Sequence, residues 1–139
     1  MQKFWLAVAR GREMRAQSTN ESWWCLPFEA AVGDMLLLYC PRQVSATSQG
    51  IFAEATVTSS PERSLECAGF GKGAALGRAS IVIHHRFKPH LTAKAMKKDA
   101  LLRHANFIRL NFQGTTFSLD QDVHSRLRVL LSALDDVST

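Results

Sequence analysis

Apolar positions along the chain gather into four short segments that are typical of β-strands. Residues 3–9 and 35–40 are mainly apolar runs, and residues 51–58 alternate between two sets of side chains with a period of two. Residues 79–87 form a fourth run. Such runs, bounded by turn residues, are typical of strands because successive side chains point to opposite faces. The pattern predicts a sheet, and Pro89 is expected to end its last strand.

The C-terminal part of the chain carries a longer period, which predicts a helix over residues 119–135. The stretch from Ser118 to Gln121 matches a capping box, and Asp120 and Asp122 suit the positive end of a helix dipole. The apolar stripe at helical spacing comprises Val123, Leu127, Leu130, Leu131 and Leu134. We therefore expect this helix to pack on the sheet.

The order of these elements indicates an α+β fold. A shorter helix is predicted from a Thr92 cap to about Asp99. Strands outnumber helices and do not alternate regularly with them, which favours a small mixed β-barrel flanked by short helices over a doubly wound sheet. The length of 139 residues is that of one ordinary domain. We expect a single domain over residues 1–139.

Charge is concentrated in one part of the chain. The sequence has 17 basic and 12 acidic residues, and residues 72–109 hold nine of the basic residues against one acid. A basic segment on an otherwise near-neutral domain indicates a polyanionic partner, most often nucleic acid. The alternative is a solvated surface that serves solubility. The residues predicted to contact phosphate are Lys72, Arg78, Lys94, Lys97, Lys98 and Arg103.

Trp23 and Trp24 lie in a short polar stretch between two apolar runs. Tryptophan is costly to expose to water and carries a flat π face, so the pair predicts either a hydrophobic plug or the wall of an aromatic pocket. The basic segment favours the pocket wall.

Residues with catalytic potential are present, but they form no recognised motif. The glycine-rich loop over residues 69–77 lacks the phosphate-binding signature and precedes a strand. His84 and His85 are neighbours on a strand and are expected to point to opposite faces, which argues against a shared metal. Without a nucleophilic triad, we expect no metal, no cofactor and no enzyme activity.

Glu54 lies on a predicted strand, on the face shared with Phe52 and Thr56. A buried carboxylate must be paired or hydrogen-bonded, because an isolated buried charge is expensive. The favoured interpretation is a partly exposed side chain paired with a basic residue such as Arg86.

Three cysteines, Cys25, Cys40 and Cys67, lack Cys-x-x-Cys spacing and are expected to be reduced thiols. No run approaches the roughly 20 apolar residues of a membrane helix, and no signal peptide is evident. We expect a soluble protein of the cytoplasm, or of the nucleus if the source is eukaryotic.

Several short motifs occur in an order that resembles the EVE domain of the PUA-like superfamily. They are a Phe-Trp-Leu strand at residues 4–6, a Trp-Cys-Leu-Pro segment at 24–27, and a Val-Gly-Asp turn into an apolar strand at 32–39. A Gly-Ile strand containing a glutamate follows at 50–61, and residues 114–119 are similar to the family's ending. The match spans nearly the whole chain. Residues 9–12 depart from the family pattern, in which an Asn-Pro or a Ser-containing turn is usual.

The resemblance implies a small β-barrel related to the YTH domain, whose aromatic cage reads a methylated base. EVE domains are associated with recognition of modified bases, notably modified cytosines in DNA. The implied partner is therefore DNA or RNA carrying a modified base, with a possible partner enzyme acting in trans. Trp24 is the first choice for a pocket wall. The base-binding pocket predicted on this basis comprises Trp24, Trp23, Cys25, Arg10, Tyr39 and Glu54.

Two other functions stay open. A related PUA-like branch, the ASCH domains, includes small hydrolases that act on modified nucleosides, and Glu54 with a neighbouring lysine would then be catalytic. In a protein-interaction module, Trp23 and Trp24 would instead anchor a partner protein.

Overall fold

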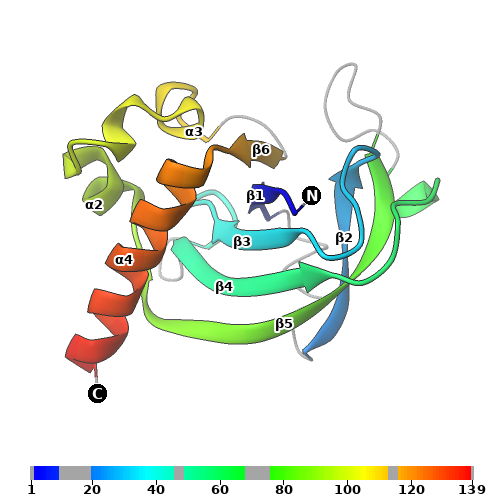
Figure 1. Ribbon diagram of the computed structural model, residues 1–139, viewed down its shortest axis with the longest axis horizontal. Helices are drawn as coiled ribbons and strands as arrows, with labels where there is room; N and C mark the ends of the chain where they lie inside the picture. Colours follow the sequence, from blue (N-terminus) through cyan, green and yellow to red (C-terminus); the bar gives the residue numbers. More distant parts are fainter. Residues whose placement is uncertain (1, 10–19, 46–48, 68–75, 113–115, 139) are drawn as a thin grey trace.

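The computed structural model describes residues 2–9, 20–45, 49–67, 76–112 and 116–138, and their central feature is one curled six-stranded sheet (Figure 1). The strands are β1 (Phe4–Val8), β2 (Glu21–Pro27), β3 (Met35–Cys40), β4 (Gly50–Val57), β5 (Leu76–Leu91) and β6 (Thr116–Leu119). The helices are α2 (Ala93–Lys98), α3 (Asn106–Arg109) and α4 (Gln121–Ser138), with short 3-10 turns η2 (Leu65–Cys67) and η3 (Leu102–His104). The predicted α+β fold, a small mixed curved sheet with short helices, is confirmed.

The strand order is β2-β5-β4-β3-β1-β6, so β2 and β6 form the two edges of the described sheet. Strands β1 and β3 run parallel, with Phe4 opposite Met35, whereas the other pairs are antiparallel. The long strand β5 is strongly curved, so that β2, which pairs with its first half, is turned toward the opposite side of the curl (Figure 1). This curl encloses one face of the sheet.

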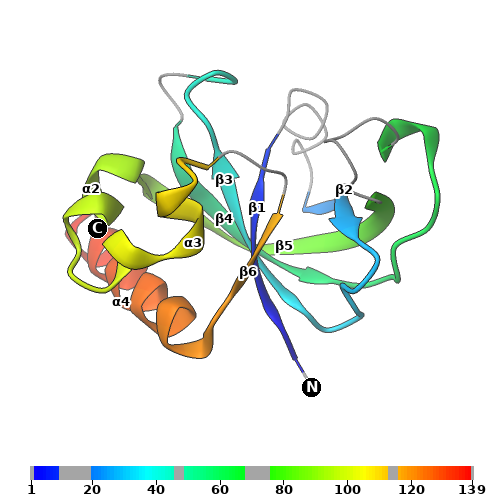
Figure 2. The same cartoon turned by 90° about the horizontal axis from the view of Figure 1, so that it is seen from above.

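Two apolar clusters lie on the two faces of the sheet. The first, called the interior cluster, contains Trp5, Ala7, Ala9, Trp24, Leu26, Ala30, Leu36, Leu38, Cys40, Phe52, Ala53, Ala55, Val57, Ala79, Ile81 and Ile83. The second, called the helix-side cluster, joins the opposite face to the helices and includes Leu6, Leu37, Tyr39, Phe87, Met96, Phe107, Phe112, Leu127 and Leu131. Figure 2 shows the helices gathered on one side of the curl and β2 on the other. The period of two in each strand produces this division.

The predicted strands agree with β1, β3, β4 and β5, but β5 is longer than expected and continues through Pro89 to Leu91. The register explains the difference. Between Ile51 and Ala53 the partner on β5 changes from Leu91 to Arg86, so several residues of β5 face a shorter stretch of β4. Proline is tolerated in such an irregular stretch, because its missing N–H removes no regular ladder bond.

Two segments differ from what the sequence pattern predicts. The two tryptophans lie within strand β2, not in a polar connection between strands. Ser118 lies in the short strand β6 opposite Trp5, so it does not cap the helix, and α4 begins at Gln121. Thr92 does cap α2 as predicted, since its Oγ1 accepts a hydrogen bond from the Ala95 N–H at 3.2 Å.

Asp34 ties the start of β3 to the neighbouring segments. It is buried, and its Oδ2 accepts hydrogen bonds from Trp5 Nε1 and the Ala31 N–H, both at 3.0 Å. Its Oδ1 accepts a third from the Lys3 N–H at 3.0 Å. The turn before it uses Gly33, whose φ of +94° favours glycine. One carboxylate therefore fixes three separate pieces of backbone and side chain.

Candidate nucleic-acid interface

Strand β2 divides the two tryptophans between opposite faces of the sheet. Trp24 is fully buried in the interior cluster. Its Nε1 is buried and has no hydrogen-bond partner in the part of the chain that the structure describes. By contrast, Trp5 Nε1 in the same cluster donates to Asp34. Because an unpaired buried donor is costly, the Trp24 indole N–H stands out as a donor without an acceptor.

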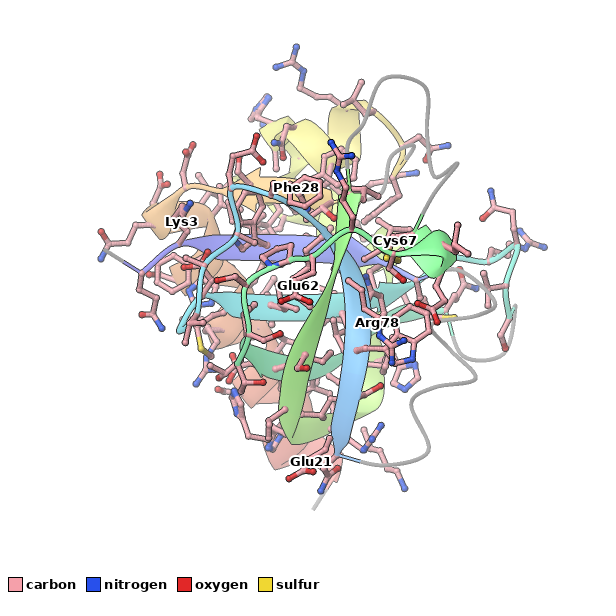
Figure 3. The ribbon with its side chains drawn as sticks, turned by 90° about the vertical axis from the view of Figure 1, so that its right-hand side faces the viewer. Lys3, Glu21, Phe28, Glu62, Cys67 and Arg78 are labelled. Atoms are coloured by element: carbon pink, nitrogen blue, oxygen red, sulfur yellow. A yellow bond between two sulfur atoms is a disulfide. The ribbon has the colours of Figure 1, made fainter. Side chains whose placement is uncertain are left out.

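Trp23 lies on the outer face of β2, where it is partly exposed. Its partner in register is Ser80, and the guanidinium carbon of Arg78 lies 4.8 Å from the centre of its ring. Together they line a shallow cavity of about 510 Å³, here called the outer hollow, formed by Glu21, Ser22, Trp23, Thr58, Arg78, Ser80, Ile81 and Val82. Figure 3 looks onto β2 and β5 from this side, with Glu21 and Arg78 labelled. An aromatic face and a cation thus meet at an open surface.

Cys25 and Cys67 form a disulfide, so the prediction of three reduced thiols is wrong for this pair. The bond joins β2 to η2 across 42 residues of sequence, a contact that no local spacing announces. The third cysteine, Cys40, is buried and free. Burial raises the pKa of the Cys40 thiol, while a hydrogen bond with the Ser45 backbone acts in the other direction.

The disulfide places Glu66 beside Arg78. The Glu66 carboxylate lies 3.0 Å from Arg78 Nη1, and both side chains are nearly half exposed. A hydrogen bond from Ser64 and then the Arg78 guanidinium lower the pKa of Glu66. Arg78, predicted to contact phosphate, is therefore neutralised by an acid in this structure.

Tyr39 lies on the other face of the sheet, in the helix-side cluster. Its ring stacks on Phe112 with centroids 4.0 Å apart, and burial raises the pKa of Tyr39 to about 12. Asn111 and Phe112 have φ of 52° and 58°, the left-handed region that ends α3 and directs the chain back to β6. The structure therefore does not place Tyr39 on the same face as Trp24.

Glu54 also faces the helices. It is only 3% exposed, and its carboxylate pairs with Arg128 of α4 and with His84 Nδ1 at 3.5 Å. The prediction that Glu54 pairs with a basic side chain is confirmed, with Arg128 as the partner, whereas the prediction that it is partly exposed is wrong. The register shift with β5 between Ile51 and Ala53 separates Glu54 from Phe52, which lies in the interior cluster together with Ala53. A second shift follows, between Glu54 and Ala55.

The same irregularity changes the expected arrangement of the two histidines. Glu54 is opposite His85 while Ala55 is opposite Ile83, so His84 is an extra residue on β5. His84 and His85 consequently line one cavity instead of opposite faces. This cavity of about 260 Å³ is lined by Glu54, His84, His85, Phe87, Arg128, Leu131 and Ser132. It includes no lysine, and the described residues contain no group of three or more potential metal ligands.

The other predicted phosphate contacts lie at the helical end of the molecule. Lys94, Lys97 and Lys98 are exposed on α2, and Arg103 is exposed on η3. The acid Asp99, which is the C-cap of α2, is bound to Arg126 at 2.7 Å. Figures 1 and 2 place α2 at the end opposite to β2.

Arg10 and Lys72 lie outside the described residues. Of the predicted site residues that the structure describes, Trp23, Cys25 and Arg78 lie together. Trp24 lies in the interior cluster, Tyr39 and Glu54 lie on the helix side of the sheet, and the lysines of α2 form a separate region.

Arg128 and Asp34 are the polar residues that sequence reasoning missed. Arg128 follows the apolar stripe residue Leu127 on α4, which is a signal that it sits at the border of the packed face. The sequence pattern indicates Asp34 only as part of a turn. Its burial next to a tryptophan N–H is a tertiary property.

No family model and no curated protein sequence matches this chain. Solved structures do match it in shape. Protein PSPTO5229 from Pseudomonas syringae has a TM-score of 0.73 at 13% identity, over 91% of this chain and 98% of that protein. Human THYN1, whose structure contains DNA with 5-methylcytosine, has a TM-score of 0.64 at 11% identity over 93% and 97%. The ASCH protein from Zymomonas mobilis has a TM-score of 0.53 at 12% identity over 92% and 95%.

These likenesses define the fold as PUA-like, a curled mixed sheet with a few short helices. The resemblance to the EVE domain is thus supported at the level of the fold. No helix among the described residues has the length and apolar character needed to cross a membrane.

Proposed function

We propose that this protein is a nucleic-acid-binding domain of the EVE type that takes a modified base, such as a methylated or hydroxymethylated cytosine, into the inner side of its curled sheet. The fold is shared with a protein seen in complex with DNA that contains 5-methylcytosine. The observation that carries the proposal for this chain is the buried, unpartnered indole N–H of Trp24.

Trp24 offers both elements of base recognition. Its ring gives a stacking face worth about 1 to 3 kcal/mol per base. Its Nε1–H would donate to a carbonyl or ring nitrogen of the base and form a hydrogen bond for which the described residues offer no acceptor. The interior cluster combines alanines, among them Ala7, Ala53 and Ala79, with larger side chains such as Leu26 and Phe52. Because Trp24 is fully buried among them, a base would reach its ring only after these neighbours move aside.

The remaining affinity would come from phosphate contacts. The exposed lysines of α2 and Arg103 present a cationic surface whose neighbouring acid, Asp99, is engaged by Arg126. Such contacts add affinity without base preference. Base selectivity and salt dependence therefore belong to different residues in this proposal.

The hydrolase alternative is less well supported by the site. It requires a lysine beside Glu54, and the cavity around this carboxylate is lined by Arg128 and two histidines instead. Its direct test is product formation from acylated cytidine.

A pair of matched substitutions tests the proposal. Trp24→Phe retains a π face and removes the unpartnered N–H, whereas Trp5→Phe removes an N–H that Asp34 already accepts. We expect Trp24→Phe to reduce the preference for 5-methylcytosine over cytosine in otherwise identical oligonucleotides, with binding weakened about tenfold by the missing hydrogen bond. Trp5→Phe is expected to lower stability and to leave the preference unchanged.

Fluorescence anisotropy with methylated, hydroxymethylated and unmodified oligonucleotides measures the preference, and urea unfolding measures stability. Equal selectivity in the Trp24→Phe and wild-type proteins would refute the assignment of Trp24. Absence of oligonucleotide binding by the wild type at low salt would refute the function itself.

A further inference from the structure

The outer hollow is accessible on the side of the sheet away from the helices, and its most prominent groups are an aromatic ring and a cation. The Trp23 ring is partly exposed and the Arg78 side chain is 44% exposed. The rest of the hollow is lined by the hydroxyl-bearing residues Ser22, Ser80 and Thr58, by the acid Glu21 and by the apolar side chains of Ile81 and Val82. An aromatic ring beside a cation and hydroxyls is the arrangement that binds a stacked base and its phosphate in single strands.

Residues 62–67 lie beside β5 and β2 on the Arg78 side of the hollow and are anchored to both strands (Figure 3). Glu62 exchanges two backbone hydrogen bonds with Arg78, at 3.0 and 2.7 Å. A side chain at Gly77 would approach the Glu62 backbone to 2.9 Å, so glycine is needed for this close approach. At the other end, the disulfide from Cys67 to Cys25 fixes η2 directly beneath Trp23.

This anchoring places an acid beside Arg78, the cation of the hollow. Glu66, one residue before the disulfide, pairs with Arg78 and holds its guanidinium over the Trp23 ring. The cation is thereby neutralised, and it covers the face on which a base would stack. An exposed ion pair is weak by itself, so the position of Glu66 depends on the anchoring of its segment: the disulfide, the Glu62–Arg78 backbone bonds and the hydrogen bond that Ser64 donates to its carboxylate.

We propose that the outer hollow is a second contact site for single-stranded nucleic acid, and that the Cys25–Cys67 disulfide closes it by holding Glu66 against Arg78. The inference rests on the proposed function, because it takes nucleic acid as the partner. When the disulfide is reduced, η2 is released, Arg78 turns to a phosphate and the Trp23 ring receives a base.

Reduction requires a dithiol as the second reactant. One thiolate of the dithiol attacks a sulfur of the Cys25–Cys67 bond and forms a mixed disulfide, and the second thiol then displaces the protein sulfur. The protein gains two thiols, with two electrons and two protons supplied by the dithiol, which becomes a cyclic disulfide.

The test uses the full chain and a fluorescein-labelled 12-mer of thymidine, with dissociation constants measured over a series of salt concentrations. Cys67→Ser removes the disulfide without replacing a residue that lines the hollow, and Glu66→Gln keeps the disulfide but removes the neutralising charge. Glu62→Gln is the matched control, because it removes the same charge from the same segment while Glu62 bonds Arg78 through its backbone. Trp23→Ala is combined with each variant.

We expect Cys67→Ser, Glu66→Gln and dithiol-treated wild type to bind the oligonucleotide more tightly than the oxidised wild type. One added phosphate contact should steepen the slope of log affinity against log salt by about 0.7. Trp23→Ala should remove the gain and weaken binding by roughly 5- to 150-fold, the range expected when one base no longer stacks on an aromatic ring. Glu62→Gln should behave as the oxidised wild type.

Two results would overturn the inference alone: affinities that do not respond to loss of the disulfide or of Glu66, or a gain that survives Trp23→Ala. In both cases retained preference for 5-methylcytosine leaves the proposed function standing. A complete lack of oligonucleotide binding by all proteins overturns both, and would leave the hollow as a surface for a partner other than nucleic acid.

Discussion

Replacing Asp34 by asparagine should strongly destabilise the fold, although it preserves side-chain size. The native carboxylate accepts three hydrogen bonds, two at Oδ2 from Trp5 Nε1 and the Ala31 N–H and one at Oδ1 from the Lys3 N–H. Asparagine has one acceptor oxygen and one donor group. Its best orientation keeps the two bonds at the Oδ2 position and turns its amide N–H toward the Lys3 N–H.

The magnitude follows from these contacts. One bond to a charged acceptor is removed, which costs about 1.5 to 3 kcal/mol, and the two that remain lose their charge assistance. A donor facing a donor adds a desolvation cost at a side chain that is 1% exposed. We expect a loss of about 3 kcal/mol in the free energy of unfolding, which corresponds to roughly 10 °C in Tm for a chain of this size.

Urea unfolding monitored by tryptophan fluorescence and circular dichroism measures this loss, and Trp5→Phe serves as a partner in a double-mutant cycle. Trp5→Phe removes one of the three donors, so the two substitutions act on the same network. Their combined effect should be smaller than the sum by about 1 to 2 kcal/mol. Additive effects would show that Trp5 and Asp34 do not stabilise the fold through their shared bond.

The effect should also depend on pH. Burial raises the pKa of Asp34, but the hydrogen bonds from Trp5, Ala31 and Lys3 outweigh it, so the folded-state pKa is lowered. A lowered pKa contributes stability that is present above the unfolded value of about 3.9 and is lost as pH falls through the folded value. The difference between wild type and Asp34→Asn should therefore be constant from about pH 7 to 5 and shrink below about pH 4. A difference that is small at pH 7, or that persists unchanged in acid, would refute the reasoning.

The remaining predictions concern charge and cysteine chemistry. Four exposed cations at the helical end are predicted to bind phosphate: Lys94, Lys97, Lys98 and Arg103. Neutralising them should flatten the slope of log affinity against log salt for a DNA duplex by about 0.9 for each phosphate that is no longer bound. An unchanged slope after all four are substituted would contradict a binding role for them. Reducing the Cys25–Cys67 bond, which closes a loop of 42 residues, should lower the free energy of unfolding by about 2 to 4 kcal/mol in urea titrations. A thiol assay should find one reactive group per oxidised chain, Cys40, and only after unfolding, because this thiol is buried and its pKa is raised. Three reactive thiols in the unreduced protein would contradict the disulfide.

Much of the sheet was predictable because its strands appear in the sequence as apolar runs or as side chains that alternate with a period of two. Strand β2 was not recognised, since both of its faces carry large or apolar groups. Trp24 points into the interior cluster, while Cys25 forms the disulfide with Cys67 on the other face and Trp23 packs against that disulfide. Strand β6 has only four residues, too few for a period to be evident.

The candidate site was less predictable than the fold, for a physical reason. The pairing of Glu54 with Arg128 spans 74 residues, and the disulfide spans 42. Which side chains meet depends on two register shifts between β4 and β5, and a shift of one residue moves a side chain to the other face. Local spacing therefore drew attention to Trp23 and Glu54 but did not indicate which residues they contact.

The position of β1 has a consequence for how the chain acquires its structure. This strand, near the N-terminal end of the sequence, lies between β3 and β6, with Phe4 opposite both Met35 and Leu119. Its second neighbour is thus translated more than a hundred residues after it. Contacts so distant in sequence slow folding, because the intervening chain must lose its freedom before the contact forms. During synthesis one edge of β1 stays unpaired until β6 has left the ribosome. A nascent or truncated chain would associate with other strands at this edge.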